Sequence, residues 1–305
     1  MSDYDVAVVG GGPAGLSAAL LLGRARRRVL LLDSGEHRND PARMMHGFLT
    51  RDGIPPAEFR RIAREQLAAY PQVELRDARV EAVEPGFTLH LAGGASPVAA
   101  RAVLLATGMA DELPEIPGLR PLYGLDAWHC PYCDGWERRG EAMAVLGEGV
   151  AGYRMALEMR GWTDRLVLCC QGKRPEARHR AKLAALGIEL REAKVVELLS
   201  EAGRLSALRL ADGEVLPRSV LVLAAAQRQR SDLAQRLGCG LTRGGLVRAA
   251  HDGATDIPGL YVAGDAAPHL QMAVVAAAQG AMAAFAINTA LLREVVLPAA
   301  SGGRP

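Results

Sequence analysis

The chain has 305 residues, half of them hydrophobic, and this length favours two domains that each bury a core of their own. Its formal net charge is +2, with acidic and basic residues spread along the sequence. This distribution argues against nucleic-acid binding, which needs a clustered basic face.

The N-terminus enters an apolar run without the basic segment of a signal peptide. Farther along, the longest apolar runs are broken by Gly or Arg well short of the ~20 residues that a membrane span needs. The five cysteines are odd in number and irregularly spaced, unlike the framework of a secreted disulfide-rich domain. We therefore expect a cytoplasmic protein without a membrane span.

The first predicted unit has a buried strand over residues 5–10, a glycine-rich turn, a helix over 16–22 and a second strand over 29–32. An acid follows that strand, and this order is typical of a dinucleotide-binding fold. The first glycine permits a tight turn, the second lets the backbone approach a pyrophosphate, and the third lets the helix pack closely on the strand. The acid can hold a ribose hydroxyl. The candidate cofactor-binding residues are Gly10, Gly12, Pro13, Ala14, Gly15 and Asp33.

Beyond this unit, short strands are predicted over residues 73–76, 79–83, 87–91 and 102–106. The Pro-rich segment 113–118 is typical of a crossing between domains.

Next in the chain is a Cys-x-x-Cys pair, Cys130 and Cys133, with Pro131 and Tyr132 between the cysteines. Zinc needs about four ligands, and no second Cys-x-x-Cys or His-x₃₋₅-His pair occurs, so we expect no metal site. A buried, inert pair is one interpretation, because free cysteine behaves as a small hydrophobe. A redox pair is the favoured one, because a Cys-x-x-Cys can close a disulfide and keep one thiolate reactive.

The dinucleotide pattern then recurs, with a strand over residues 142–147, a helix over 153–159 and a strand over 166–170. Gly147, Gly149 and Gly152 repeat the glycine spacing. Where an acid would favour NAD, the chain has Lys173 and Arg174, and cations there can meet the 2′-phosphate of NADPH. Solvated loop charges are the alternative.

The last part of the sequence contains predicted strands over residues 194–198, 205–210 and 220–223, a Gly-rich crossing at 244–245 and a helix over 274–292. A short apolar segment before this helix ends in Ala263, Gly264 and Asp265.

These motifs, in this order, resemble the flavoprotein disulfide oxidoreductases with two dinucleotide folds, in their small thioredoxin-reductase-like form. The resemblance covers nearly the whole chain. It rests on the two glycine fingerprints, the cysteine pair followed by Asp134 and Gly135, and two further motifs, Ala106-Thr107-Gly108 and Ala263-Gly264-Asp265.

The resemblance implies an α/β protein with two Rossmann-like dinucleotide-binding domains of the three-layer ββα type, the second inserted into the first. The expected domains are 1–112 and 244–305 for FAD and 113–243 for NADPH. Ala106, Thr107 and Gly108 would close the first FAD segment. Gly264 and Asp265 would contact the ribityl and phosphate portion of the flavin, and Gln271 would lie near the isoalloxazine ring. The family also implies a homodimer.

By the same resemblance, Cys133 would face the flavin, Cys130 would exchange with substrate, and Asp134 would protonate the leaving thiolate. His46 lies in the segment that approaches the flavin in this family, and a solvated loop histidine is the alternative.

The chain departs from the thioredoxin reductase pattern in its second fold, while its FAD motifs stay intact. It lacks two acids on the helix after Gly149, and its cations after the second strand are displaced to Lys173 and Arg174.

Two activities therefore stay open. In the first, NADPH reduces FAD, FAD reduces the cysteine pair, and the pair reduces thioredoxin or a similar disulfide. In the second, as in the dithiol oxidases of gliotoxin and holomycin biosynthesis, electrons pass from a small dithiol through the pair to FAD and oxygen. Pro131 and Tyr132 favour the oxidase activity, whereas Asp134 favours the reductase activity. A flavin-binding redox sensor is a third class, which no added domain or charged tail supports.

Overall fold

The first unit is built on a parallel sheet whose central strands are buried on both faces. The computed structural model describes residues 3–296. Strands β1 (Tyr4–Val9), β2 (Val29–Asp33), β3 (Val73–Asp77), β6 (Val98–Leu105) and β17 (Leu260–Val262) lie parallel in the order β3-β2-β1-β6-β17. Alternate residues of β1 point to opposite faces, so Val6 and Val8 join one core while Ala7 and Val9 join the other.

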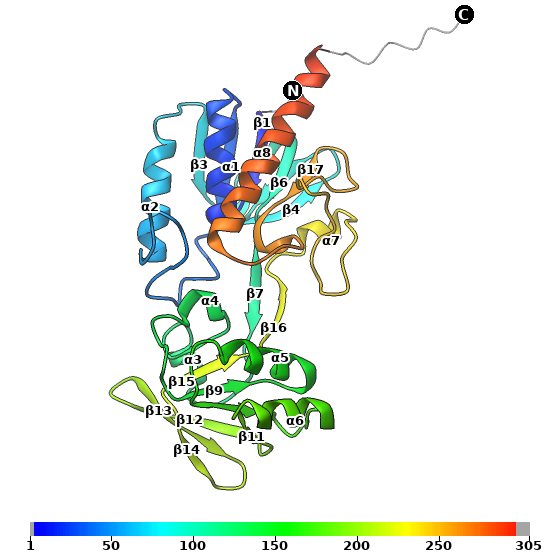
Figure 1. The fold of residues 1–305 in the computed structure, drawn as a ribbon. Coiled ribbons are helices and arrows are strands. Elements are labelled where there is room, and N and C mark those ends of the chain that lie inside the picture. Colours follow the sequence, from blue (N-terminus) through cyan, green and yellow to red (C-terminus); the bar gives the residue numbers. More distant parts are fainter. Residues whose placement is uncertain (1–2, 297–305) are drawn as a thin grey trace, which may run out of the picture.

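Each face of this sheet is covered by a different layer (Figure 1). Helices α1 (Pro13–Arg24) and α8 (Ala273–Val296) cover one face, and the antiparallel strands β4 (Val80–Glu84) and β5 (Thr88–Leu91) cover the other. Helix α2 (Pro56–Leu67) flanks α1 and was not predicted. The first unit is thus the expected three-layer ββα fold.

The expectation that every apolar run falls well short of a membrane span is wrong for helix α8. Its residues 273–294 are long and apolar enough to cross a membrane by length and composition, with a mean hydropathy of 1.5. However, Ala283, Ala284 and Ile287 are buried in the core beneath α1. A Cβ on Gly280 would lie 1.9 Å from the carbonyl oxygen of Ala14, so the two helices cross in close contact. One face of α8 therefore packs in the core of the first unit, while Phe285 and Leu292 are exposed.

The second unit repeats the architecture. Strands β8 (Ala127–Trp128), β9 (Met143–Leu146), β10 (Leu166–Cys169), β11 (Glu189–Arg191) and β15 (Val220–Leu223) form a parallel sheet in the order β11-β10-β9-β15-β8. One face carries α5 (Gly149–Met159) and α6 (Ala177–Ala185), and the other carries the antiparallel strands β12 (Val195–Glu201), β13 (Arg204–Leu210) and β14 (Val215–Pro217). Two Rossmann-like units, one inserted into the other, confirm the predicted fold class.

Two antiparallel strands, β7 (Met109–Glu112) and β16 (Ala226–Gln229), carry the chain between the units (Figure 1). The first crossing strand, β7, lies just before the Pro-rich segment 113–118 that was expected to be the crossing. After β16, Leu233 and Ala234 of α7 (Leu233–Arg236) and Cys239 already belong to the core of the first unit. We therefore propose that the second FAD segment begins directly after β16, earlier than the expected boundary at residue 244.

Four short elements complete the fold. They are η1 (Ala92–Gly94), α3 (Leu119–Leu122), α4 (Pro131–Asp134) and η2 (Gly264–Ala266). Helix α4 holds the cysteine motif on the side of the second unit that faces the first (Figure 1).

Candidate active site

The first glycine fingerprint has the geometry of a phosphate-binding turn. Gly10 has a φ of +115°, and a Cβ there would lie 2.2 Å from the carbonyl oxygen of Ala106. A Cβ on Gly15 would lie 1.8 Å from the carbonyl oxygen of Gly10, so only glycine lets α1 pack this closely on β1. A Cβ on Gly12 would meet nothing within 4 Å, and Gly12 precedes α1 without a side-chain cap. The backbone N–H groups at the start of α1 therefore face open space, as anion binding requires.

Two cavities meet at this turn and share Glu36, Thr107 and Arg230. The smaller, of about 210 Å³, brings together most of the predicted residues. Those on its wall are Gly12, Pro13, Ala14, Asp33, Ala106, Thr107, Gly108, Cys130, Cys133, Asp134, Gly264, Asp265 and Gln271. The larger, of about 560 Å³, is lined by Gly10 and by residues at the ends of β2 and β3. An elongated dinucleotide fits this paired arrangement.

Asp33 is buried and already has partners. Its carboxylate lies 3.2 Å from Nε2 of His37 and accepts a hydrogen bond from the backbone of Gly35. Burial acts most strongly on the pKa of Asp33 and raises it, but the hydrogen bonds together keep the pKa below its ordinary value. The predicted role of Asp33 at the ribose stays a prediction. Glu36, three residues farther on and on the wall of both cavities, is a second candidate that the sequence analysis missed.

Cys130 and Cys133 are joined by a disulfide on the wall of the smaller cavity. Pro131 begins the short helix between them, with Cys130 as its N-cap residue. Among residues 3–296, no group of three or more His, Cys, Asp or Glu side chains is arranged to hold a metal ion. The other cysteines, Cys169, Cys170 and Cys239, are buried.

Asp134 is placed to hold a proton close to the disulfide. Burial, assisted by Glu137, raises the pKa of its carboxyl to about 6, against the opposing effects of His46 and Arg138. A carboxyl group in this range can donate a proton near neutral pH. His46 also lies on the cavity wall, with Nδ1 3.6 Å from carboxylate oxygens of both Asp52 and Glu137.

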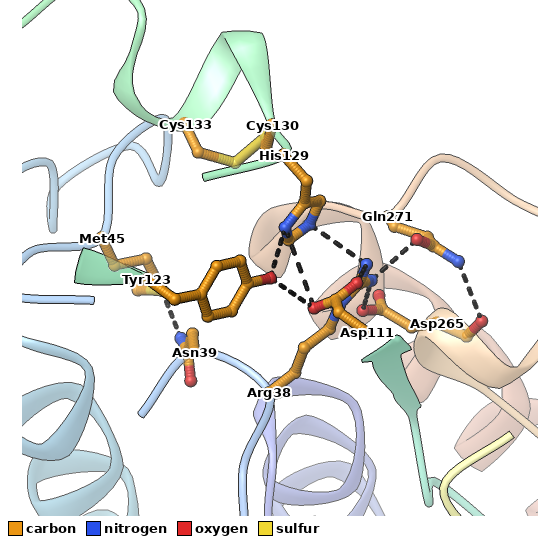
Figure 2. Close-up of a disulfide and its surroundings, with 10 residues drawn as sticks. All are labelled: Arg38, Asn39, Met45, Asp111, Tyr123, His129, Cys130, Cys133, Asp265 and Gln271. Carbon is orange, nitrogen blue, oxygen red and sulfur yellow. Dashed lines mark hydrogen bonds and ion pairs between the residues drawn. A yellow bond between two sulfur atoms is a disulfide. The ribbon is translucent and has the colours of Figure 1, made fainter. Parts of the chain in front are cut away.

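A hydrogen-bonded group lies between the disulfide and the cofactor side of the cavity, and the sequence analysis named only two of its members, Asp265 and Gln271 (Figure 2). Its centre is Arg38, which pairs with Asp111 at 2.5 Å and with Asp265 at 2.8 Å. Its members come from distant parts of the chain, so no sequence spacing relates them: Arg38, Asp111, Tyr123, His129, Asp265 and Gln271.

The second glycine fingerprint keeps the close packing of its helix on its strand, but its backbone differs from the first, because the positive φ lies at Gly149 and not at the first glycine. A Cβ on Gly152 would lie 2.2 Å from the carbonyl oxygen of Gly147, and one on Gly149 would meet nothing within 4 Å. The predicted cations of this unit are exposed and paired with acids. Lys173 lies 2.5 Å from the carboxylate of Glu148, the N-cap residue of α5, and Arg174 lies 2.6 Å from that of Glu192.

Comparison with known proteins places this site in a family. The model of the pyridine nucleotide-disulphide oxidoreductases matches residues 4–280. A probable thioredoxin reductase of Arthroderma benhamiae is 31% identical, with 86% of this chain and 74% of that protein covered. Thioredoxin reductase tcpT of Claviceps purpurea is 30% identical, with 95% of each chain covered.

Solved structures agree with the fold. The crystal structure of HlmI superposes with a TM-score of 0.92 at 38% identity, covering 96% of this chain and 93% of that one. The putative thioredoxin reductase TrxB of Bacillus anthracis superposes with a TM-score of 0.91 at 32% identity, covering 96% and 99%.

Proposed function

Because the chain belongs to the pyridine nucleotide-disulphide oxidoreductase family, as a thioredoxin-reductase-like FAD-dependent disulfide oxidoreductase, we propose that it uses NADPH to reduce a thioredoxin-like protein or a similar disulfide. The observation that carries this proposal is the Cys130–Cys133 disulfide on the wall of the dinucleotide cavity, beside Asp134. The relatives named thioredoxin reductase support the choice of substrate.

The residues of the first unit fit FAD. The open backbone at Gly12, Pro13 and Ala14 would hold the pyrophosphate at the start of α1. Gly264 and Asp265, on the cavity wall, would hold the middle of the cofactor. When bound, FAD supplies a two-electron carrier that exchanges electrons with a dithiol.

The cysteine pair performs the exchange with substrate. In the reduced protein, the Cys130 thiolate attacks one sulfur of the substrate disulfide, which forms a mixed disulfide and releases the other substrate sulfur as a thiolate. Cys133 then attacks Cys130, so the Cys130–Cys133 disulfide forms and the second substrate sulfur leaves. The substrate gains two electrons and two protons, and the pair loses two electrons. Asp134 supplies one of these protons to a leaving thiolate, and the other comes from the Cys133 thiol, which loses its proton as it attacks Cys130.

NADPH as the electron source is supported by the second glycine fingerprint, whose three glycines have the same spacing as the first and whose third glycine likewise packs against the carbonyl oxygen of the first. Lys173 and Arg174 remain the proposed contacts to the 2′-phosphate. They lie in the loop after β10, at the carboxyl edge of the sheet where nucleotides bind in such folds.

A second candidate function is oxidation of a small dithiol, with oxygen as the final acceptor. It is favoured by the ion pair between Glu148 and Lys173. Glu148 puts a carboxylate at the start of α5, where a nucleotide phosphate would have to bind, and two negative groups there repel one another. In this second function, electrons enter through the cysteine pair, and the second unit binds no nucleotide.

Anaerobic rapid mixing of the FAD-loaded protein tests both functions. Fast bleaching of the flavin absorbance by NADPH, but not by a dithiol alone, would support the reductase. Fast bleaching by a dithiol such as dithiothreitol, followed by peroxide formation when air is admitted, would support the oxidase. A Cys130→Ser/Cys133→Ser double variant serves as the control, because it should keep bleaching by NADPH and lose bleaching by the dithiol. Slow bleaching by both reagents would contradict both functions and favour a redox sensor.

We also propose that the protein is a cytoplasmic homodimer that binds neither nucleic acid nor membranes. Exposed apolar side chains on α8, Phe285 and Leu292, offer a surface for a second copy. Sedimentation equilibrium would test this, and a monomer at micromolar concentration would contradict the proposed dimer.

A further inference from the structure

We propose that Tyr123 and His129 are positioning residues that hold the redox disulfide against the FAD cavity, by joining Arg38 of the first unit across the contact between the two units. This inference rests on the proposed function only in taking Cys130–Cys133 as the redox pair. We call the connected side chains of Arg38, Asp111, Tyr123 and His129 the relay.

The relay begins on the cofactor side of the cavity. Nη1 of Arg38 donates to Oδ2 of Asp265 at 2.8 Å and to Oε1 of Gln271 at 2.7 Å. Its Nε and Nη2 donate to both carboxylate oxygens of Asp111, in the connecting strand β7, at 3.0 and 2.5 Å. Nη2 also lies 3.1 Å from Nε2 of His129, the residue before Cys130 (Figure 2). One guanidinium group therefore links the first unit, the connecting strand and the start of the cysteine motif.

The hydrogen bonds fix the proton positions. Arginine can only donate, so Nε2 of His129 must accept from Arg38, and the ring proton must be on Nδ1. Nδ1 then donates to the Tyr123 oxygen at 2.8 Å, and the Tyr123 hydroxyl donates to Oδ2 of Asp111 at 2.8 Å. Each donor and acceptor in the relay has a partner only while the imidazole of His129 is neutral.

The electrostatic surroundings keep His129 neutral. Burial is the largest influence and lowers the pKa of its imidazole, and Arg38 lowers it further. Asp111 and Asp265 raise the pKa of His129, but it stays below its ordinary value. Burial and the Asp111 carboxylate together raise the pKa of Tyr123, so its hydroxyl keeps the proton that it donates.

Backbone packing beside the relay shows how closely the two units meet there. Gly124, next to Tyr123, has a φ of +82°, and a Cβ on it would lie 2.4 Å from the carbonyl carbon of Pro41 in the first unit. Tyr123 precedes β8, and His129 lies between β8 and the cysteine helix, so losing their bonds would free Cys130 and Cys133 from the cavity wall.

The test uses two FAD-loaded variants, Tyr123→Phe and His129→Phe, each made in wild type and in a Cys130→Ser background. His129→Gln is the rescue variant, because its amide can accept from Arg38 and donate to Tyr123. Tyr70→Phe is the matched control, because it removes a tyrosine–arginine bond, to Arg24, that lies wholly within the first unit.

In the Cys130→Ser background, the Cys133 thiolate beside FAD should give a long-wavelength absorbance shoulder. We expect the shoulder to fall severalfold in Tyr123→Phe and His129→Phe, with FAD content unchanged, and to persist in His129→Gln and Tyr70→Phe. In the reduced wild-type background, alkylation of the pair by a bulky maleimide should become about five- to tenfold faster in the first two variants, which corresponds to losing one buried hydrogen bond. Cys169, Cys170 and Cys239 are buried and should not compete.

An unchanged shoulder and unchanged alkylation in both Phe variants would overturn the proposal. If the Cys130→Ser parent itself lacks the shoulder, the assignment of Cys133 to the flavin has failed. The alkylation rates would then still decide whether the relay holds the cysteine motif in place.

Discussion

Replacing Asp134 by Asn should make the protein more stable at neutral pH while nearly abolishing disulfide exchange. Burial raises the pKa of this carboxyl from its ordinary value of 3.8 to about 6. Its charged form is therefore disfavoured in the folded protein. Asn keeps the shape and the neutral charge of the protonated acid but has no proton to donate.

The magnitude follows from linkage between protonation and folding. The difference between 3.8 and about 6, at 1.36 kcal/mol for each pKa unit, corresponds to about 3 kcal/mol. Because the folded state holds this proton more tightly than the unfolded state, the contribution is fully present below pH 3.8 and is lost as pH rises to about 6. The stability difference between Asp134→Asn and wild type should therefore grow by up to about 3 kcal/mol across this window. Exchange should slow by about 10²-fold or more, the usual contribution of a general acid.

Urea unfolding from pH 4 to 7.5, at one fixed FAD concentration, measures the first effect, and single-turnover reduction of a small disulfide measures the second. Glu137→Gln is the control, because it removes a neighbouring carboxylate whose influence on Asp134 is secondary and should leave most of the pH dependence in place. A stability difference between Asp134→Asn and wild type that stays constant from pH 4 to 7.5 would refute the reasoning, and undiminished exchange would remove Asp134 from the mechanism.

Three further predictions concern the cofactors and the thiols. Gly12→Val should fold, because its side chain enters open space, yet lose FAD, and a full complement of FAD in the purified variant would show that the pyrophosphate binds elsewhere. Changing Lys173 and Arg174 together to Ala should weaken NADPH binding about tenfold or more and NADH binding little, as titration calorimetry would show, whereas equal losses would make them solvated charges. Cys130→Ser should show a long-wavelength shoulder that disappears on acidification, while Cys133→Ser should lack it and instead form a mixed disulfide with substrate. Both cysteine variants should lose turnover, and a shoulder in Cys133→Ser would reverse the two roles.

The sequence determined the features whose physical requirement lies within a few residues. Gly10, Gly12 and Gly15 were predictable because a tight turn, an open backbone and a close helix each need glycine at a fixed spacing. The Cys130–Cys133 disulfide was predictable for the same reason, since two residues between the cysteines leave them within bonding reach. The order of strand, glycine turn, helix and strand likewise indicated the two dinucleotide-binding folds.

Only the tertiary structure decided the surroundings of these local motifs. Arg38, Asp111, His129 and Asp265 meet although up to 227 positions separate them, because the strands carry their loops to the contact between the two units. Lys173 and Arg174 have acid partners because the fold brings the loops after β9, β10 and β11 together at one edge of the second sheet. The proton affinity of Asp134 also depends on burial by distant segments, and the spacing of residues along a chain does not specify burial.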